Sequence, residues 1–291
     1  MTDQTFELVY ALNVDTLTRP LTDALRRHIE NTSGPPFVSL SYGYMILGRA
    51  YESMTTLDKR KPGQFSEEYI LSKAKRDYET GEASIRINPK TTALIVVDML
   101  EEFTKPNMTP SWIPDSTRQL TKIKELIETC RHLGVQVIYT CYAFHPTYLD
   151  MNPAFRDGVT PLDKFDDYDG PPLFQRESID PSIKPDYEKD LVIAKPSYGA
   201  FTGTALDYTL KNRKVDTVII CGTMTNYCCG TTAREAHCHG YKVVFGSDIN
   251  STDDQQLHLA ELKTLRRGFA LVLTKAQIQE ALLGAGPYTV S

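Results

Sequence analysis

Six short runs of apolar residues recur along the chain from about residue 92 onward, and amphipathic stretches separate them. The runs span 92–98, 135–141, 190–195, 217–222, 241–248 and 269–274. Runs of this length without an alternating polar face are typical of strands buried in a parallel sheet. Their alternation with helical patterns predicts an α/β protein whose parallel sheet is covered by helices on both faces.

The stretches between the runs carry helical spacing and helix-end signals. The clearest case follows the first run, where four apolar residues recur at intervals of three and four: Leu120, Ile123, Ile127 and Cys130. We expect Asp115 or Ser116 to cap this helix and Gly134 to end it. Thr204 is expected to cap the helix before the fourth run, and further helices are predicted over 253–268 and 277–284.

Residues 1–88 do not share this alternation. We therefore predict an N-terminal extension over 1–88 and a main domain over 89–291. Within the extension, Ser66 is expected to cap a helix that ends near Gly81. The apolar content of the extension is too thin for an independent core. It could serve as a lid, an oligomerisation arm or a partner surface, and the sequence does not decide between these roles.

Composition narrows the class of protein. A net charge of −5 without a dense basic cluster argues against a nucleic-acid surface. No apolar run approaches the length of a membrane span, and the first ten residues lack the layout of a signal peptide. The six cysteines contain no CxxC pair, which favours reduced thiols over a disulfide framework. We expect a cytoplasmic protein.

Three of the predicted strands end at residues that carry chemistry. Asp98 ends the first strand, Lys195 ends the third, and Cys228 follows a tight turn after the fourth. Sites in open parallel sheets lie beyond the carboxyl ends of the strands. Cys228 also precedes a predicted helix, whose dipole favours a thiolate. A buried, inert thiol is the alternative for Cys228 alone, but the coincidence of three such strand ends favours a site.

Three motifs at these strand ends resemble those of the isochorismatase-like cysteine hydrolases. They are VVDMLEEF at 96–103, AKPSYGAFTGTAL at 194–206 and GTMTNYCCGTTAREA at 222–236. The resemblance covers about 88–283. It implies a three-layer α/β/α fold with strand order 3-2-1-4-5-6 and a catalytic triad of Asp98, Lys195 and Cys228. It also implies a cis peptide at Thr223–Met224 and an oxyanion hole formed by the backbone N–H groups of Met224 and Cys228.

The chemistry of amide hydrolysis agrees with this triad. A thiol nucleophile and a proton for the leaving nitrogen are both needed. The Lys195 ammonium is expected to lower the pKa of Cys228, and Asp98 is expected to accept the thiol proton and pass it to the leaving amine. We predict a cysteine hydrolase that cleaves a C–N bond of a small amide, ureide or carbamoyl compound through a thioester. The alternatives are a vinyl-ether hydrolase of the isochorismatase type and a non-catalytic binding or regulatory protein. A thiol redox protein using Cys228 and Cys229 ranks last, because adjacent cysteines form only strained bridges.

The sequence departs from the resemblance at the position of a metal ligand. Nicotinamidases of this superfamily are expected to carry Asp-x-His after the second strand, and Ala143 stands where the aspartate would be while His145 is retained. An alanine cannot ligate, so we expect no catalytic metal, no other cofactor and no nicotinamidase activity. Cys229 is expected to be packed, and His237 and His239 to be favourable charges at a helix end rather than metal ligands.

Substrate contacts are predicted less directly. We nominate four aromatic residues and one histidine, each with core packing or a structural role as its alternative: Phe103, Trp112, His145, Tyr198 and Phe201. Arg156 could bind a carboxylate or lie solvated in its loop. The substrate itself is not predicted, because specificity depends on the long segment 142–188 and on any neighbouring subunit. The resemblance implies a homo-oligomer, a dimer or a tetramer.

Overall fold

The computed structural model describes residues 66–72, 87–145, 147, 149–157, 174 and 178–284. By its internal contacts the chain divides into two units, Met1–Tyr69 and Ile70–Ser291, and every strand described below belongs to the second. Residues 67–72 are helical, and Ser66 Oγ accepts a hydrogen bond from the Tyr69 N–H at 3.2 Å, as its predicted capping role requires. The remainder of that helix lies outside the described residues. The boundary at residue 88 and the roles of the extension stay predictions.

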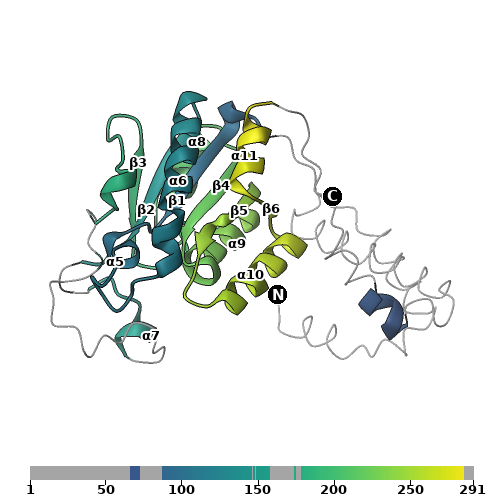
Figure 1. Ribbon diagram of the computed structural model, residues 1–291, viewed down its shortest axis with the longest axis horizontal. Coiled ribbons are helices and arrows are strands. Elements are labelled where there is room, and N and C mark those ends of the chain that lie inside the picture. The colour runs from purple at the N-terminus through teal and green to yellow at the C-terminus, as the bar shows by residue number, and fades with distance from the viewer. Residues whose placement is uncertain are drawn as a thin grey trace, which may run out of the picture. The chain divides into compact units, whose positions relative to one another are not determined.

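Six parallel strands form one sheet in the order β3-β2-β1-β4-β5-β6 (Figure 1). They are β1 (Thr92–Val97), β2 (Gln136–Tyr142), β3 (Leu191–Lys195), β4 (Thr217–Thr223), β5 (Lys242–Ser251) and β6 (Leu271–Leu273). Every residue of β1 and β4 is buried, as expected for apolar runs covered on both faces. The predicted α/β class, the parallel sheet and the strand order are all confirmed.

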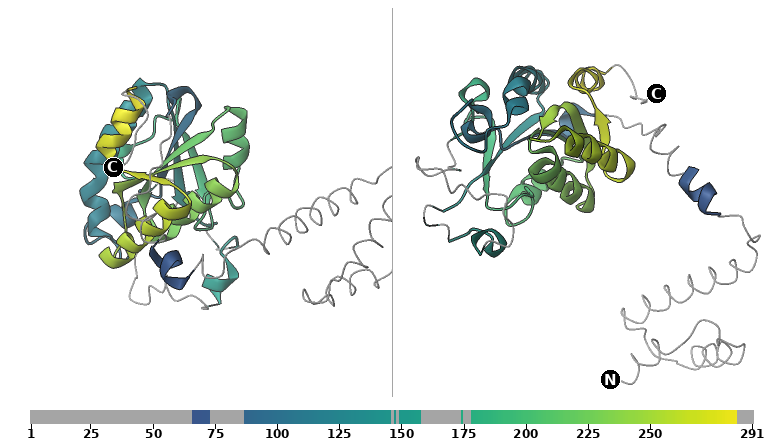
Figure 2. Two further views of the ribbon diagram at one scale, coloured as in Figure 1. Left: turned by 90° about the vertical axis from the view of Figure 1, so that its right-hand side faces the viewer. Right: turned by 60° about the horizontal axis from the view of Figure 1, so that its bottom comes forward.

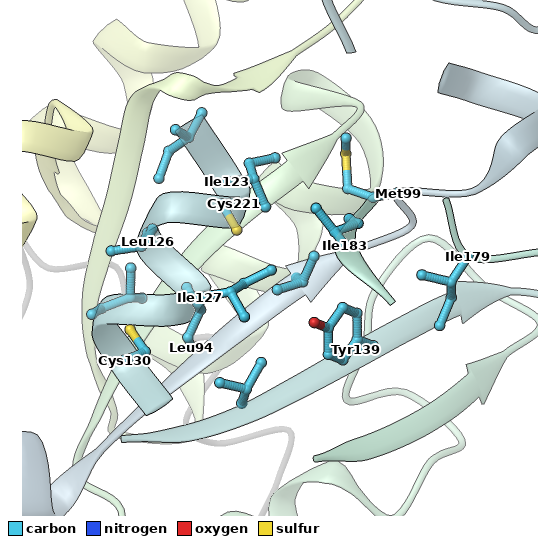
Figure 3. Close-up of a cluster of buried hydrophobic side chains, with 14 of the residues drawn as sticks. Leu94, Met99, Ile123, Leu126, Ile127, Cys130, Tyr139, Ile179, Ile183 and Cys221 are labelled. Atoms are coloured by element: carbon cyan, nitrogen blue, oxygen red, sulfur yellow. The ribbon is translucent and has the colours of Figure 1, made fainter. Parts of the chain in front are cut away.

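Helices cover both faces of the sheet (Figures 1 and 2). One face packs against α6 (Pro114–His132) and α11 (Lys275–Leu282), and the other against α8 (Leu206–Asn212), α9 (Gly230–Cys238) and α10 (Gln255–Gly268). Along β1, Leu94 and Val96 belong to the first cluster, whereas Ala93, Ile95 and Val97 belong to the second. In Figure 3, the α6 side chains Ile123 and Ile127 belong to one buried cluster with the strand residues Leu94 and Cys221. The shorter elements are η2 (Pro89–Thr91), α5 (Glu101–Thr104), α7 (Pro153–Arg156), η4 (Pro181–Ile183) and η5 (Thr225–Cys229).

The helix ends differ in part from the predicted caps. The expected cap of α6 at Asp115 or Ser116 is wrong: the helix begins at Pro114, and Ile113 is the N-cap without a side-chain bond. Proline at the first helical position has its backbone angle already set, so the helix starts there. Ser116 Oγ instead donates to the Ile113 carbonyl at 2.7 Å from within the first turn. Thr204 lies one residue before the N-cap of α8, and its hydroxyl accepts from the Leu206 N–H at 3.1 Å.

The centre of the sheet is a topological switch point. The chain moves outward from β1 through β2 to β3 and then returns to place β4 on the other side of β1. Sites in such sheets lie at the carboxyl ends of the strands on either side of this point. The approach of β4 to β1 is close there: a Cβ at Gly222 would lie 2.0 Å from the Val97 carbonyl oxygen, and Gly222 has a φ of +134°. Glycine is required at this position.

Of the helices in the described ranges, none combines the length and the apolar character needed to cross a bilayer.

Candidate active site

Asp98 directly follows β1 and is held from several directions. Its φ is +49°, in the left-handed region, and its N–H donates to the Thr140 carbonyl at 3.2 Å. The Thr140 hydroxyl donates to Asp98 Oδ1 at 2.8 Å. The side chain has no exposed surface. These bonds from β2 leave Oδ2 directed at the next residue of the site.

Lys195 ends β3 and forms a fully buried ion pair with Asp98. The Nζ lies 2.6 Å from Asp98 Oδ2, and both side chains are 0% exposed. Nζ also donates to the Ser197 carbonyl at 2.9 Å and lies 5.2 Å from the ring centre of Tyr142. Burial disfavours the ammonium, but the charge of the paired Asp98 carboxylate outweighs this effect and raises the pKa of Lys195 above its usual value. Lys195 is therefore an ammonium at neutral pH.

Cys228 completes the group from the turn between β4 and α9. Its side chain is 5% exposed and lies close enough to Asp98 and Lys195 for both to influence its ionisation. Burial raises the pKa of the Cys228 thiol, and although the Lys195 ammonium opposes this, the pKa stays above its usual value. The predicted lowering of this pKa is therefore wrong, because removal from water outweighs the nearby positive charge. In the resting protein the sulfur carries its proton.

The turn that presents Cys228 is a single π-helical turn, η5, which begins after a cis peptide bond at Thr223–Met224. The resemblance implied this cis bond. Side chains from outside the turn hold it in place: Thr225 Oγ1 lies 2.9 Å from His258 Nδ1, and the Thr252 hydroxyl donates to Asn226 Oδ1 at 2.7 Å. Thr225 and Asn226 therefore support the turn.

His258 of α10 was not identified from the sequence, because nothing in its helix signals contact with the turn. One ring nitrogen meets Thr225, and a further bond joins the imidazole to the Ser247 backbone. Burial lowers the pKa of His258, although Ser247 and Asp115 oppose this effect. The neutral imidazole thus links α10 to the base of the nucleophile turn.

Cys228 opens onto a cavity of about 130 Å³. Besides Cys228, its lining residues are Phe103, Pro110, Ser111, Trp112, Ile113, Tyr142, Tyr198, Met224, Tyr227 and Asp253. Three of the nominated substrate contacts, Phe103, Trp112 and Tyr198, are in this set. A second, more polar cavity of about 200 Å³ lies between α6 and α10, but none of Asp98, Lys195 and Cys228 lines it. The cavity beside the sulfur is the candidate site.

Two nominated contacts lie elsewhere. His145 is exposed, and its Nδ1 lies 2.8 Å from Thr147 Oγ1. Phe201 is buried against His239, with ring centres 5.0 Å apart. Neither belongs to the lining of the cavity. The side chain of Arg156 lies outside the described residues.

Six lining residues were not nominated from the sequence, and three of these carry an aromatic ring or a carboxylate: Tyr142, Tyr227 and Asp253. Tyr142 ends β2 and Tyr227 directly precedes Cys228, so position at a strand end and in the nucleophile motif were usable signals. Asp253 follows β5, whose carboxyl end was predicted too early.

The residues after β2 do not fit a metal ion. Ala143 is buried and offers no donor, while His145 faces solvent. Within the described ranges, no three His, Cys, Asp or Glu side chains are grouped to hold a metal. The chemistry below therefore uses no metal. His237 lies in the last turn of α9 and His239 is its C-cap, in accord with their predicted place at a helix end.

Comparisons with known proteins agree with this fold. Residues 92–277 match the family model described as "Isochorismatase domain". Nicotinamidase 3 of Arabidopsis thaliana is 32% identical over 216 residues, 74% of this chain and 100% of the relative. A ureidoacrylate amidohydrolase of Methylobacterium radiotolerans is 24% identical over 212 residues, 68% of this chain and 82% of the relative. The crystal structure of a cysteine hydrolase from Pseudomonas syringae superposes with a TM-score of 0.61 and 28% identity, covering 69% of this chain and 97% of that one.

The chain belongs to the isochorismatase family, among the cysteine hydrolases that share this fold. It is a hydrolase of carbon–nitrogen bonds other than peptide bonds, the class to which its matched amidohydrolase relatives belong.

Proposed function

We propose that the protein hydrolyses a small amide, ureide or carbamoyl compound through a thioester on Cys228. The observation that carries the proposal is the meeting of Asp98, Lys195 and Cys228 beside one small cavity. The three residues come from the ends of different strands, and the carboxylate and ammonium are 2.6 Å apart with no exposed surface. The cavity of about 130 Å³ has room for a single small substrate.

The resting thiol requires a base, and Asp98 is the carboxylate whose charge acts on it. Asp98 accepts the proton of Cys228 as the sulfur attacks the carbonyl carbon. The backbone N–H groups of Met224 and Cys228 bind the oxyanion, a contribution of about 3 kcal/mol per donor. Asp98 then gives the proton to the leaving nitrogen, and the C–N bond breaks.

The second half of the reaction reverses these roles. Asp98 takes a proton from water, the hydroxide attacks the thioester, and the C–S bond breaks to release the acid. Asp98 returns the proton to Cys228. Lys195 remains an ammonium throughout; it holds the carboxylate in place and stabilises negative charge on the sulfur.

A panel of small amides, ureides and carbamoyl compounds, assayed for ammonia release, tests this proposal. The panel includes nicotinamide, because the relative from Arabidopsis thaliana is named a nicotinamidase. Ala143 argues against nicotinamidase activity in this chain. Cys228→Ala should lower turnover by about 10⁴-fold or more, since the variant loses its nucleophile.

The matched control is Cys229→Ala, which removes the neighbouring buried sulfur that does not line the cavity. It should keep turnover. Undiminished activity in Cys228→Ala would refute the nucleophile, and the absence of ammonia or acid from every compound would favour a binding or regulatory role.

A further inference from the structure

Aromatic rings dominate the cavity beside Cys228. Five of its lining residues are aromatic: Phe103, Trp112, Tyr142, Tyr198 and Tyr227. The ring centres of Tyr142 and Tyr198 are 6.1 Å apart, and those of Tyr198 and Tyr227 are 5.4 Å apart, so the last three form a continuous wall. The faces of such rings carry negative potential and attract cations.

The charged side chain in the lining of the cavity is negative, as is the potential at the faces of the aromatic rings. Asp253 is the one residue among the described lining residues whose side chain is ordinarily charged at neutral pH. It is exposed, and its Oδ1 accepts from the Thr252 hydroxyl at 3.1 Å. The charges of Asp98 and Lys195 cancel within their ion pair, and the thiol adds none. The described part of the site therefore has a net charge of about −1 at neutral pH, which is the charge of Asp253.

We propose that Asp253 and the aromatic wall select amides that carry a positive charge on the group attached to the carbonyl, and disfavour amides that carry a carboxylate there. This inference rests on the proposed function and specifies its substrate class. With the carbonyl at Cys228, a cationic ring or side chain lies against Tyr198 and Tyr227 and within the field of Asp253. A carboxylate in that place meets the negative side chain.

Two compounds of nearly the same shape test the preference. 1-Methylnicotinamide has a fixed positive charge, and 3-methylbenzamide is its uncharged counterpart. The kcat/KM for ammonia release is measured for both with the native protein and with Asp253→Asn. Because the greater intrinsic reactivity of the pyridinium amide is the same for both proteins, it cancels when their two ratios are compared. Asp253→Asn should lower the cation-to-neutral ratio about two- to fivefold, mainly through KM for the cation.

Asp254→Asn is the matched control. It removes an equal charge one residue away, keeps an oxygen for the cap of α10, and does not alter the lining of the cavity. It should leave the ratio unchanged. An unchanged ratio in Asp253→Asn, or an equal fall in both variants, would overturn the assignment to Asp253.

Protection of Cys228 from iodoacetamide separates this inference from the proposed function. The half-protection concentration of a compound, the one that halves the rate of labelling, reports its binding, whether or not it is hydrolysed. This concentration is measured for 1-methylnicotinamide, 3-methylbenzamide and 3-carbamoylbenzoate. We expect the cationic compound to bind most tightly and the carboxylate most weakly. In Asp253→Asn the difference between their half-protection concentrations should be smaller. If the compounds bind in that order but no ammonia is released, the charge preference is supported and the proposed hydrolysis is not. Equal protection by all three compounds would overturn the preference even if hydrolysis occurs.

Discussion

Cys228 is subject to two opposing effects within one small volume. Its burial favours the neutral thiol, while the ammonium of Lys195 favours the thiolate, and burial prevails. In the proposed reaction, a thiol of this kind ionises when a base takes its proton during the attack on the carbonyl. Asp98 meets that need because its carboxylate is fixed by Thr140 on one oxygen and paired with Lys195 on the other.

The pH dependence of labelling tests the state of the thiol. Because the pKa of Cys228 is raised, its rate of reaction with iodoacetamide should keep increasing above about pH 10, where a short cysteine peptide with blocked ends, with a pKa of about 8.5, has reached its plateau. The experiment requires a Cys238→Ser background, since Cys238 is exposed whereas the other five cysteines are buried. Mass spectrometry then reports the modification of Cys228. A plateau below pH 8 would show a lowered pKa instead.

At the scale of elements, the site depends on how closely β4 approaches β1. Gly222 lies against the Val97 carbonyl, one residue before Asp98, and its own carbonyl accepts from Gln119 Nε2 at 2.9 Å. The position of Gly222 therefore also determines the position of Thr223, the last residue of β4, and of η5, which follows it. Any atom added at residue 222 displaces one of the two central strands.

Gly222→Ala should lower the free energy of unfolding by about 3–5 kcal/mol, from the clash with the Val97 backbone and from a φ that alanine rarely adopts. Gly134→Ala is the matched control: its φ is +73°, but a Cβ there would meet nothing within 4 Å. It should cost only about 1–2 kcal/mol. Urea unfolding of both variants measures the difference. Equal losses would mean that backbone conformation, and not the contact with β1, sets the requirement at residue 222.

The apolar runs predicted the strands because central parallel strands are buried on both faces and carry no polar alternation. The end of β5 was predicted at Asp248, whereas the strand continues to Ser251. Asn250 explains the difference: its Nδ2 donates to the Ile220 and Gly246 carbonyls at 3.0 and 2.6 Å, which supports the strand past a shift in register. Such a polar stretch is predicted to be a loop, because the hydrogen bonds of the side-chain amide that hold it as a strand cannot be seen in the sequence.

The positions of the three chemical residues were predictable because each belongs to a strand end or to the turn that follows. The cavity wall was only partly predictable. Phe103 and Phe201 both follow strands that end in the site, yet Phe103 lines the cavity and Phe201 packs beneath α9. Their directions depend on how α5 and the segment after β3 pack, and a local sequence pattern does not contain that information.

At the scale of the whole molecule, the described buried clusters draw all of their members from Ile87 onward. Ile87 is 8% exposed, and the Asn88 side chain caps η2. We expect a chain that begins at residue 87 to fold without the preceding segment, with a melting temperature within about 5 °C of the full chain.

A chain that begins at residue 92 is the control, because it lacks Ile87 and η2 and should melt at a lower temperature. Circular dichroism measures the melting. Light scattering on the full and shortened chains tests the predicted homo-oligomer and shows whether residues 1–86 contribute to assembly. Aggregation of the chain from residue 87 would mean that the extension is required for the fold.

The residues assigned to the reaction and several of those assigned to recognition occupy different kinds of segment. Asp98 follows β1, Lys195 ends β3 and Cys228 lies in the turn directly after β4, whereas Trp112, Tyr198 and Asp253 belong to longer connecting segments. Connections tolerate changes of length and composition that a packed sheet does not. A new specificity can therefore arise, in evolution or by engineering, through replacement of connections alone. That separation offers a physical reason why relatives named for nicotinamide and for ureidoacrylate share one architecture.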